Sequence, residues 1–162
     1  GVVTHNLERI GIDFNWRTNA NHALIFVSVA AAWKILGYNI VFFLAGLKNI
    51  PQDVLEAASL DGAGAWKRFW AIKFPLLSPV TFFLLIMNTL YACFETFGLI
   101  DITTEGGPGR ATDTLIYRLY RDGFVSQNRL GLASAQSILL LVFVVALTLL
   151  QFRLAGRRTF YR

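Results

Sequence analysis

Three long apolar runs constrain this chain more than any other feature of its sequence. They cover about residues 21–47, 76–100 and 132–152, and each provides the roughly 20 residues that a helix needs to cross a bilayer. The composition agrees, since 55% of the 162 residues are hydrophobic and only 15% are charged. Ordinary soluble domains carry roughly 25% charged residues. We therefore expect an all-α, polytopic transmembrane helical bundle with three spans in this chain.

The distribution of basic residues predicts how the spans are oriented. Three spans place the 48–75 loop and the carboxy-terminal tail on one side, and the amino-terminal segment and the 101–131 loop on the other. The first side carries Lys48, Lys67, Arg68, Lys73, Arg153, Arg157, Arg158 and Arg162, and the second carries Arg9, Arg17, Arg110, Arg118, Arg121 and Arg129. Basic residues next to a span favour the cytoplasm, and the tail cluster follows the last span directly. We place the 48–75 loop in the cytoplasm.

The 48–75 loop has the pattern of two short helices joined by a turn. We expect the first helix to end near Leu60, and Gly62 and Gly64 to permit the turn that follows it. A second helix is predicted from Ala65 to Phe74, where Pro75 ends or kinks it. Three-and-four spacing puts an aromatic stripe on one face of this helix. Two interpretations remain open on periodicity alone: a docking surface for a soluble partner, or an interfacial loop that only connects two spans.

The residues of this loop resemble a known motif. Glu56-Ala57-Ala58, Gly62, Ile72 and Pro75 have the spacing of the EAA loop in permease subunits of ABC importers, which work with a substrate-binding protein. Phe74 stands where that family usually has leucine, which exchanges one apolar residue for another. Further matching segments indicate the carbohydrate-uptake type, and they are Ala45-Gly46-Leu47, Ile50-Pro51, Phe82-Phe83 and Thr104–Pro108. Residues 1–162 resemble the carboxy-terminal part of one such transmembrane domain, so we expect an upstream part that is missing here.

The resemblance implies a role for the EAA loop as a coupling helix that docks on an ATP-binding subunit. The implied coupling residues are Glu56, Ala57, Ala58, Asp61 and Gly62. It also implies several partners: a second permease subunit, two ATP-binding subunits, a solute-binding protein that meets the periplasmic 101–131 loop, and the lipid bilayer. The expected location is the bacterial cytoplasmic (inner) membrane. The resemblance further implies that ATP and Mg²⁺ are bound and ATP is hydrolysed by the partner subunits, with no cofactor in this chain.

A closer resemblance concerns the second half of the chain. Tyr91–Phe97, Thr114–Tyr117, Asp122–Phe124 and Ala135–Ser137 are similar to the A-type permeases of importers for sn-glycerol-3-phosphate. The implied function is a translocation path for that solute or a related one. The alternative is a sugar or disaccharide, because sister permeases share much of this pattern. A membrane scaffold without transport activity is a further alternative.

Lys34 is a charged residue near the middle of the first apolar run. A charge at that depth costs roughly 2.5–3.5 kcal/mol on insertion scales, so such residues usually face a protein interior or a water-filled path. One interpretation is that Lys34 lines the translocation path and favours an anionic solute. The other is structural, with Lys34 pairing with a neighbouring span or extending its ammonium group toward the interface.

Other polar residues in the spans allow the same two interpretations. Asn39 lies in the first run, and Asn88 and Tyr91 lie in the second, about one turn apart. They can bind solute in the path, or they can form hydrogen bonds between helices. With Lys34, they form the candidate substrate path.

The sequence excludes several classes of function. The two histidines, His5 and His22, lie at or outside the edge of a span, and no span contains aspartate, so neither a catalytic residue nor a metal site is predicted. The loop Gly106-Gly107-Pro108-Gly109 lacks the Lys-Ser/Thr pair of a phosphate-binding loop. A basic net charge of +5 in a membrane protein does not indicate nucleic acid. The stretch from Thr114 to Phe124 predicts a helix on the membrane surface.

Overall fold

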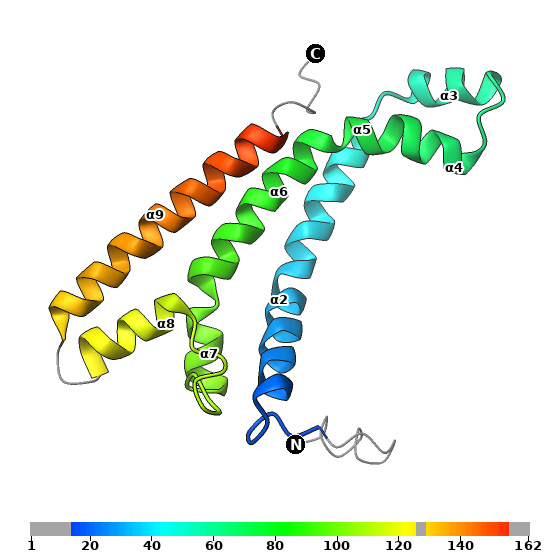
Figure 1. The fold of residues 1–162 in the computed structure, drawn as a ribbon. Helices are drawn as coiled ribbons and strands as arrows, with labels where there is room; N and C mark the ends of the chain where they lie inside the picture. The colour runs from blue at the N-terminus through cyan, green and yellow to red at the C-terminus, as the bar shows by residue number, and fades with distance from the viewer. Residues whose placement is uncertain (1–13, 126–128, 156–162) are drawn as a thin grey trace. The chain divides into compact units, whose positions relative to one another are not determined.

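The computed structural model describes residues 14–125 and 129–155. Within these ranges the chain is helical (Figure 1). The helices are α2 (Ala20–Lys48), α3 (Gln52–Leu60), α4 (Ala65–Arg68), α5 (Phe74–Leu76), α6 (Ser78–Leu90), α7 (Phe97–Thr103), α8 (Leu115–Tyr120) and α9 (Leu130–Ala155). π-helical turns cover Phe69–Lys73, Tyr91–Glu95 and Arg121–Val125. The basic residues Arg9, Arg157, Arg158 and Arg162, and also His5, lie outside the described residues.

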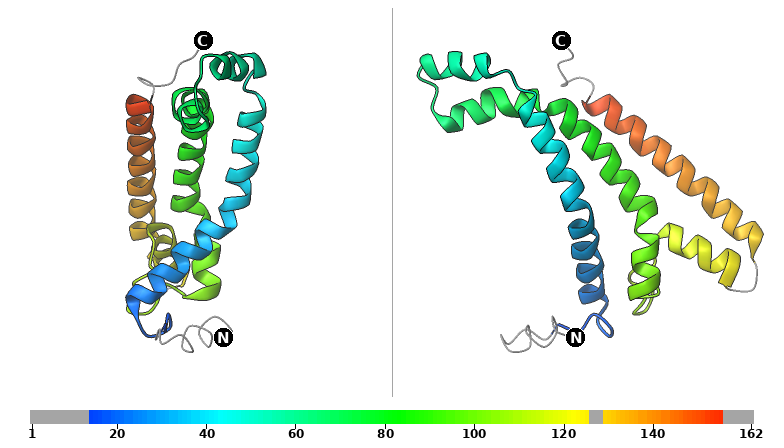
Figure 2. Two further views of the ribbon diagram at one scale, coloured as in Figure 1. Left: turned by 90° about the vertical axis from the view of Figure 1, so that its right-hand side faces the viewer. Right: turned by 180° about the vertical axis from the view of Figure 1, so that it is seen from behind.

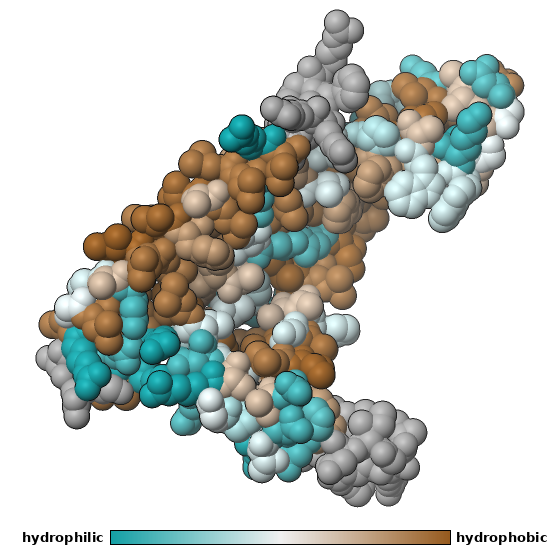
Figure 3. Space-filling view, viewed as in Figure 1, coloured by the Kyte–Doolittle hydropathy of each residue, from teal (hydrophilic) through white to brown (hydrophobic). Residues whose placement is uncertain are grey.

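Three helices are long and apolar enough to cross a membrane. They are Ala20–Lys48, Ser78–Glu95 and Leu130–Leu154. The chain itself buries only 6%, 6% and 22% of their most apolar windows, and apolar residues cover the visible face of α9 in Figure 3. A helix that is apolar on all sides and exposed within its own chain is suited to lipid or to further helices. Each of these three candidate spans overlaps one of the three apolar runs in the sequence.

The second span ends earlier than its apolar run. Helix α6 passes into the π turn at Tyr91–Glu95, and α7 then begins at Phe97. The hydroxyl of Thr96 donates to the carbonyl of Ala92 at 3.0 Å, as threonine does when it bonds back to the preceding turn. The predicted run to residue 100 therefore contains two helical segments instead of one.

The chain divides into two compact units, which we describe separately. The first comprises residues 1–34 and 90–144, and the second comprises residues 35–89 and 145–162. The first unit has a core of Val27, Ile100 and Tyr117, with Phe26, Phe97 and Leu99 packed against it. This core joins the beginning of α2 to α7 and α8.

Close backbone approach ties the π turn after α8 to α9 within the first unit. A Cβ atom at Gly123 would lie 2.9 Å from the Cβ of Ala133. Glycine is therefore the residue that fits there. The predicted helix at Thr114–Phe124 is present as α8 and the turn Arg121–Val125. Its Tyr117 is buried in the unit core, so the helix is also part of the packing.

In the second unit, α6 packs against both α2 and α9. A Cβ at Gly46 would lie 2.9 Å from Leu77 Cδ2 and 3.0 Å from Val80 Cγ2, so α2 and the start of α6 approach closely. Small residues permit such approach between membrane helices. On the other side, the amide of Gln151 donates to the hydroxyl of Thr89 at 2.6 Å. The second unit is thus held by this tight contact, by the interhelical hydrogen bond, and by ring contacts of Phe42 with Phe83 and of Phe82 with Phe152.

The segment between α2 and α6 forms a helical hairpin that projects sideways from the ends of these two helices (Figures 1 and 2). Its first arm is α3. Its second arm runs from α4 through the π turn to α5, and in all views it lies nearer to the spans than α3 does. The second arm extends to Leu76, past the predicted end at Phe74, and Pro75 lies in the first turn of α5, where its missing N–H is tolerated.

Candidate functional site

The candidate coupling residues lie on α3 and on the turn that ends it. This turn has the two hydrogen bonds of a Schellman motif. The N–H of Ala63 donates to the carbonyl of Ala58 at 3.0 Å, and the N–H of Gly62 donates to the carbonyl of Ser59 at 3.1 Å. Both acceptors are carbonyls of the last turn of α3, which would otherwise lack intrahelical partners. The turn therefore fixes the end of α3 directly after the EAA triplet.

Gly62 has the backbone conformation that this motif demands. Its φ is +75°, in the left-handed region, and a Cβ at this position would meet nothing within 4 Å. Any other residue would be disfavoured there by backbone conformation and not by collision. Gly64 also has open space around it, but its φ of −61° is one that every residue adopts. Of the two glycines predicted to permit the turn, only Gly62 is left-handed.

The surface of α3 around the triplet is open. Glu56, Ala57 and Asp61 are exposed, and Ala58 is partly buried. Two methyl groups between two carboxylates make a shallow, negatively charged surface to which another protein can approach closely. A depression of about 230 Å³ lies beside it, lined by Gln52, Leu55, Glu56, Ser59 and, from the second arm, Arg68. All five candidate coupling residues lie in the seven residues from Glu56 to Gly62, on the end of α3 and the turn that follows it.

Lys34 and Tyr91 are in contact in the first unit. The Nζ atom of Lys34 lies 5.6 Å from the centroid of the Tyr91 ring, within the range of a cation–π interaction. Tyr91 is the first residue of the π turn after α6, and its hydroxyl is buried without a hydrogen-bond partner among the described residues. The N–H donors of the ammonium that do not face the ring can bind an anion.

Asn39 and Asn88 belong to the second unit, and each has a buried amide oxygen. Neither oxygen has a hydrogen-bond partner within the described ranges. The interhelical hydrogen bond that one interpretation of these residues expects is instead made by Gln151 and Thr89. A buried acceptor without a partner costs free energy in an apolar environment, so both oxygens are suited to a donor from outside this part of the chain. The candidate path residues thus occur as one pair in each unit.

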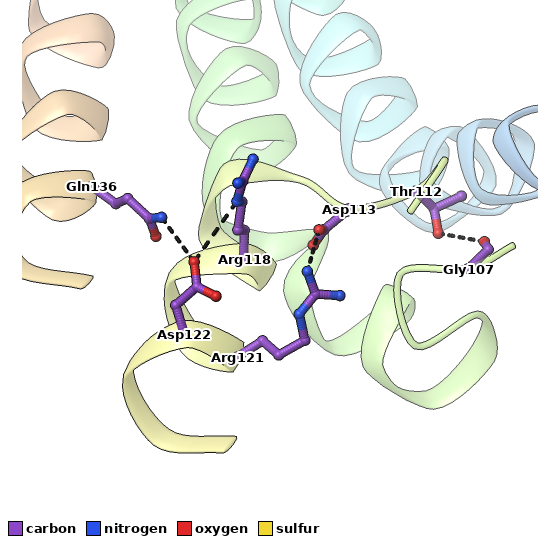
Figure 4. A network of polar contacts seen from close by, with 7 residues as sticks. All are labelled: Gly107, Thr112, Asp113, Arg118, Arg121, Asp122 and Gln136. Carbon is purple, nitrogen blue, oxygen red and sulfur yellow. Dashed lines mark hydrogen bonds and ion pairs between the residues drawn. The ribbon is translucent and has the colours of Figure 1, made fainter. Parts of the chain in front are cut away.

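The loop after α7 and the helix α8 are held by polar contacts that the sequence patterns did not reveal (Figure 4). Arg121 pairs with Asp113 at 2.7 Å, and the Asp113 side chain is only 5% exposed. Asp122 accepts a hydrogen bond from the Gln136 amide at 2.9 Å and lies 3.7 Å from Arg118. Asp113 and Arg121 are eight residues apart, and Asp122 and Gln136 are fourteen apart. These spacings match no helical repeat, and only the i, i+4 pair of Arg118 and Asp122 was accessible from sequence.

The glycine-rich turn in this loop packs on Tyr117. Gly106 has φ +82°, and a Cβ there would lie 3.0 Å from the Tyr117 ring. Burial raises the pKa of the Tyr117 hydroxyl above its usual value, and the charges of Asp101 and Glu105 raise it further. The hydroxyl of Thr112 donates to the carbonyl of Gly107 at 3.0 Å, which closes the loop. Threonine, aspartate and arginine side chains thus give this loop a defined structure.

The fold and the hairpin define a class of protein: a polytopic helical membrane protein with an exposed EAA helix between two of its spans. The chain belongs to the family described as binding-protein-dependent transport system inner membrane component, whose model matches residues 3–160. This match confirms the predicted permease fold and inner-membrane location. It also confirms that the chain is the permease component and not the ATP-binding subunit.

Individual relatives are similar over nearly the whole chain. The sn-glycerol-3-phosphate transport system permease protein UgpA of Rhizobium meliloti (strain 1021) is 52% identical over 161 residues, which are 99% of this chain and 55% of that protein. The protein of the same name from Yersinia pestis is 46% identical over 162 residues, 100% of this chain and 55% of that protein. The chain therefore spans about half the length of these relatives.

Proposed function

We propose that this chain is part of the permease subunit of an ATP-driven importer for sn-glycerol-3-phosphate. The observation that carries the proposal is the identity of 46–52% across 99–100% of the chain to permeases named for that solute. A sugar or disaccharide carried by the same family is the second candidate solute. This second candidate remains because the EAA pattern is shared across the family and does not depend on the solute.

The proposal includes several partner proteins, and α3 is the surface assigned to the ATP-binding subunit. Two ATP-binding subunits would dock at the EAA loop of this permease and of a second permease subunit, and a solute-binding protein would deliver solute at the outer face. Glu56, Ala57, Ala58, Asp61 and Gly62 are the proposed contacts with the ATPase. The exposure of Glu56, Ala57, Asp61 and Gly62 and the hydrogen-bonded turn after α3 support this role, because a docking helix must be accessible to its partner and must have a defined end.

The proposed path residues are Lys34, Tyr91, Asn39 and Asn88. Lys34 supports an anionic solute, since its ammonium group lies over the Tyr91 ring and keeps N–H donors that do not face it. The unpartnered oxygens of Asn39 and Asn88 are acceptors suited to hydroxyl groups. Glycerol phosphate carries a phosphate and two hydroxyls, so each pair of residues is proposed to contact one kind of group on the solute as it passes.

Uptake by the reconstituted transporter tests the proposal. The full-length permease is assembled with its partner subunits in proteoliposomes, and the binding protein is added with radiolabelled solute. We expect ATP-dependent uptake of sn-glycerol-3-phosphate, competed by unlabelled solute and not by disaccharides. Uptake of a disaccharide with no uptake of glycerol phosphate would instead establish the second candidate. A lack of response to any loaded binding protein would contradict a transport role.

A further inference from the structure

The second arm of the hairpin carries an aromatic face that is exposed within the described part of the chain. The side chains of Trp66, Trp70 and Phe74 are 77%, 49% and 48% exposed. They are in contact with one another, with ring centroids 5.9 Å apart for Trp66 and Trp70 and 5.1 Å apart for Trp70 and Phe74. These three rings, which we call the aromatic face, form one continuous apolar surface.

The aromatic face is not used to close the hairpin. The residues of the second arm that line the depressions beside Leu55 of α3 are Ala65, Arg68 and Lys73, and none of the three rings is among them. The aromatic residues follow the separate series 66, 70 and 74, which has the four-residue spacing of another helix face. In Figures 1 and 2 the second arm leads into α6, and α3 lies farther from α6 than the second arm does. The aromatic face therefore belongs to the arm that leads into a candidate span.

All the charged residues that neighbour this face in the sequence are basic. Lys67, Arg68 and Lys73 are the charged residues of the second arm, and no aspartate or glutamate occurs between Gly62 and Phe94. Tryptophan and other aromatic rings are enriched where a bilayer meets water. A basic helix with an aromatic face is the pattern of a segment that lies in the interface of an anionic leaflet.

The second arm is also continuous with a membrane span. Its last helical residue is Leu76, and the candidate span begins at Ser78. Between them, Leu77 is buried against the close contact at Gly46, with 6% of its surface exposed. This connection is too short to lift the arm far from the depth at which α6 begins, so the aromatic face lies within reach of the lipid headgroups.

We propose that the aromatic face docks on the cytoplasmic leaflet, with Lys67 and Lys73 binding the phosphates of acidic phospholipids. The proposal rests on the cytoplasmic placement of the hairpin in the proposed function. Acidic lipids attract juxtamembrane lysines, whereas zwitterionic lipids provide no net charge. Lipid bound here would hold the second arm while α3 is displaced by a partner.

Lipid quenching of tryptophan fluorescence tests this directly. The assembled transporter is placed in nanodiscs that contain brominated phosphatidylglycerol or brominated phosphatidylcholine. Its emission is compared with that of the Trp66→Phe, Trp70→Phe variant, so that the difference reports these two side chains. We expect brominated phosphatidylglycerol to quench the difference signal at least twofold more than brominated phosphatidylcholine.

Charge variants separate lipid binding from simple proximity. The double substitution Lys67→Gln, Lys73→Gln is expected to abolish the preference for phosphatidylglycerol. The matched control Lys48→Gln removes one charge at the end of α2, off the aromatic face, and should retain the preference. Quenching by neither lipid would show that protein covers this face and would overturn the proposal. Equal quenching by both lipids in the unmodified protein would overturn its acidic-lipid part.

The quenching measurement needs no solute, so it is separate from the test of the proposed function. If the transporter does not take up sn-glycerol-3-phosphate but still prefers phosphatidylglycerol in the quenching test, only the solute assignment is contradicted. Normal uptake with no lipid preference contradicts the lipid site alone. In wild-type proteoliposomes we also expect uptake to rise with the phosphatidylglycerol fraction, and this rise should disappear in the double lysine variant.

Discussion

A single left-handed residue explains the spacing between the EAA triplet and its glycine. The bonds from Ala63 to Ala58 and from Gly62 to Ser59 require a residue with positive φ at position 62. The carbonyl of Ala58, the last residue of the triplet, is thus bonded within the turn. The glycine of the motif is therefore part of the structure that ends the helix.

We predict that Gly62→Ala uncouples ATP hydrolysis from transport. The left-handed conformation costs a residue with a Cβ about 1–2 kcal/mol, and relief of that strain would reorient α3. The measurement is the ratio of solute imported to ATP hydrolysed in proteoliposomes, which we expect to fall severalfold. Gly64→Ala is the control, because its φ of −61° and open surroundings accept alanine. An unchanged ratio in a normally assembled Gly62→Ala complex would refute the coupling role.

A second prediction concerns Lys34. Charge-assisted hydrogen bonds contribute about 1.5–3 kcal/mol, so Lys34→Met should raise the KM for an anionic solute roughly tenfold or more. The Lys34→Arg variant keeps the charge and should retain most of the affinity. Thermal unfolding of each variant is measured beside uptake, because loss of the contact with Tyr91 also removes a structural interaction. A destabilised protein with an unchanged KM would support the structural interpretation.

At the scale of elements, helix contacts depend on small residues and a few polar bonds. Gly46 lets α2 approach α6, and Gln151 links α9 to Thr89 of α6. No charged pair is needed for either contact. Such contacts are suited to a membrane, where lipid provides no hydrophobic driving force between helices and close packing stabilises their association instead.

Gly46 provides the third prediction. A leucine side chain at this position would begin 2.9 Å from Leu77 Cδ2 and 3.0 Å from Val80 Cγ2, so Gly46→Leu should force α2 and α6 apart. Overpacking of this kind typically costs about 1–3 kcal/mol. Gly37→Leu lies on the same helix with nothing within 4 Å and should be tolerated. The melting temperature of the detergent-solubilised full-length permease distinguishes them, and equal values would contradict the close contact.

Hydropathy predicted the elements well because the membrane permits so few backbone structures. Apolar length alone located α2, Ser78–Glu95 and α9. It could not reveal the π turn at Tyr91–Glu95, since apolar and aromatic residues continue into it as far as Phe94 and resume at Phe97. The pairing of Asp113 with Arg121 was equally inaccessible, because it depends on how the loop before α8 folds back. At the candidate site, the motif located Gly62, but the donor and acceptor atoms of its turn required coordinates.

At the scale of the whole molecule, the chain is organised as two units through which the long spans run. The polar network around Asp113 and Asp122 belongs to the first unit, and the EAA hairpin belongs to the second. The proposed contact with a binding protein and the proposed contact with an ATPase thus involve separately packed parts of the chain.

The proposed topology predicts opposite accessibility for the two loops. In the full-length permease with Cys93→Ser, the variants Leu60→Cys and Ile102→Cys place one thiol on each loop, at positions that are 90% and 85% exposed. A membrane-impermeant maleimide added to intact cells should label only Ile102→Cys. Inverted membrane vesicles should give the reverse result. Labelling of both variants from the same side would contradict the three-span arrangement.

The close contact at Gly46 has a mechanical consequence for the hairpin. The chain leaves α2 at Lys48 and enters α6 at Ser78, and the contact of Gly46 with Leu77 and Val80 holds these two points together. The two ends of the hairpin are therefore joined to α2 and α6 at one place, where these helices contact each other. A push on α3 would act as a torque about that contact and would turn α2 and α6 as a pair.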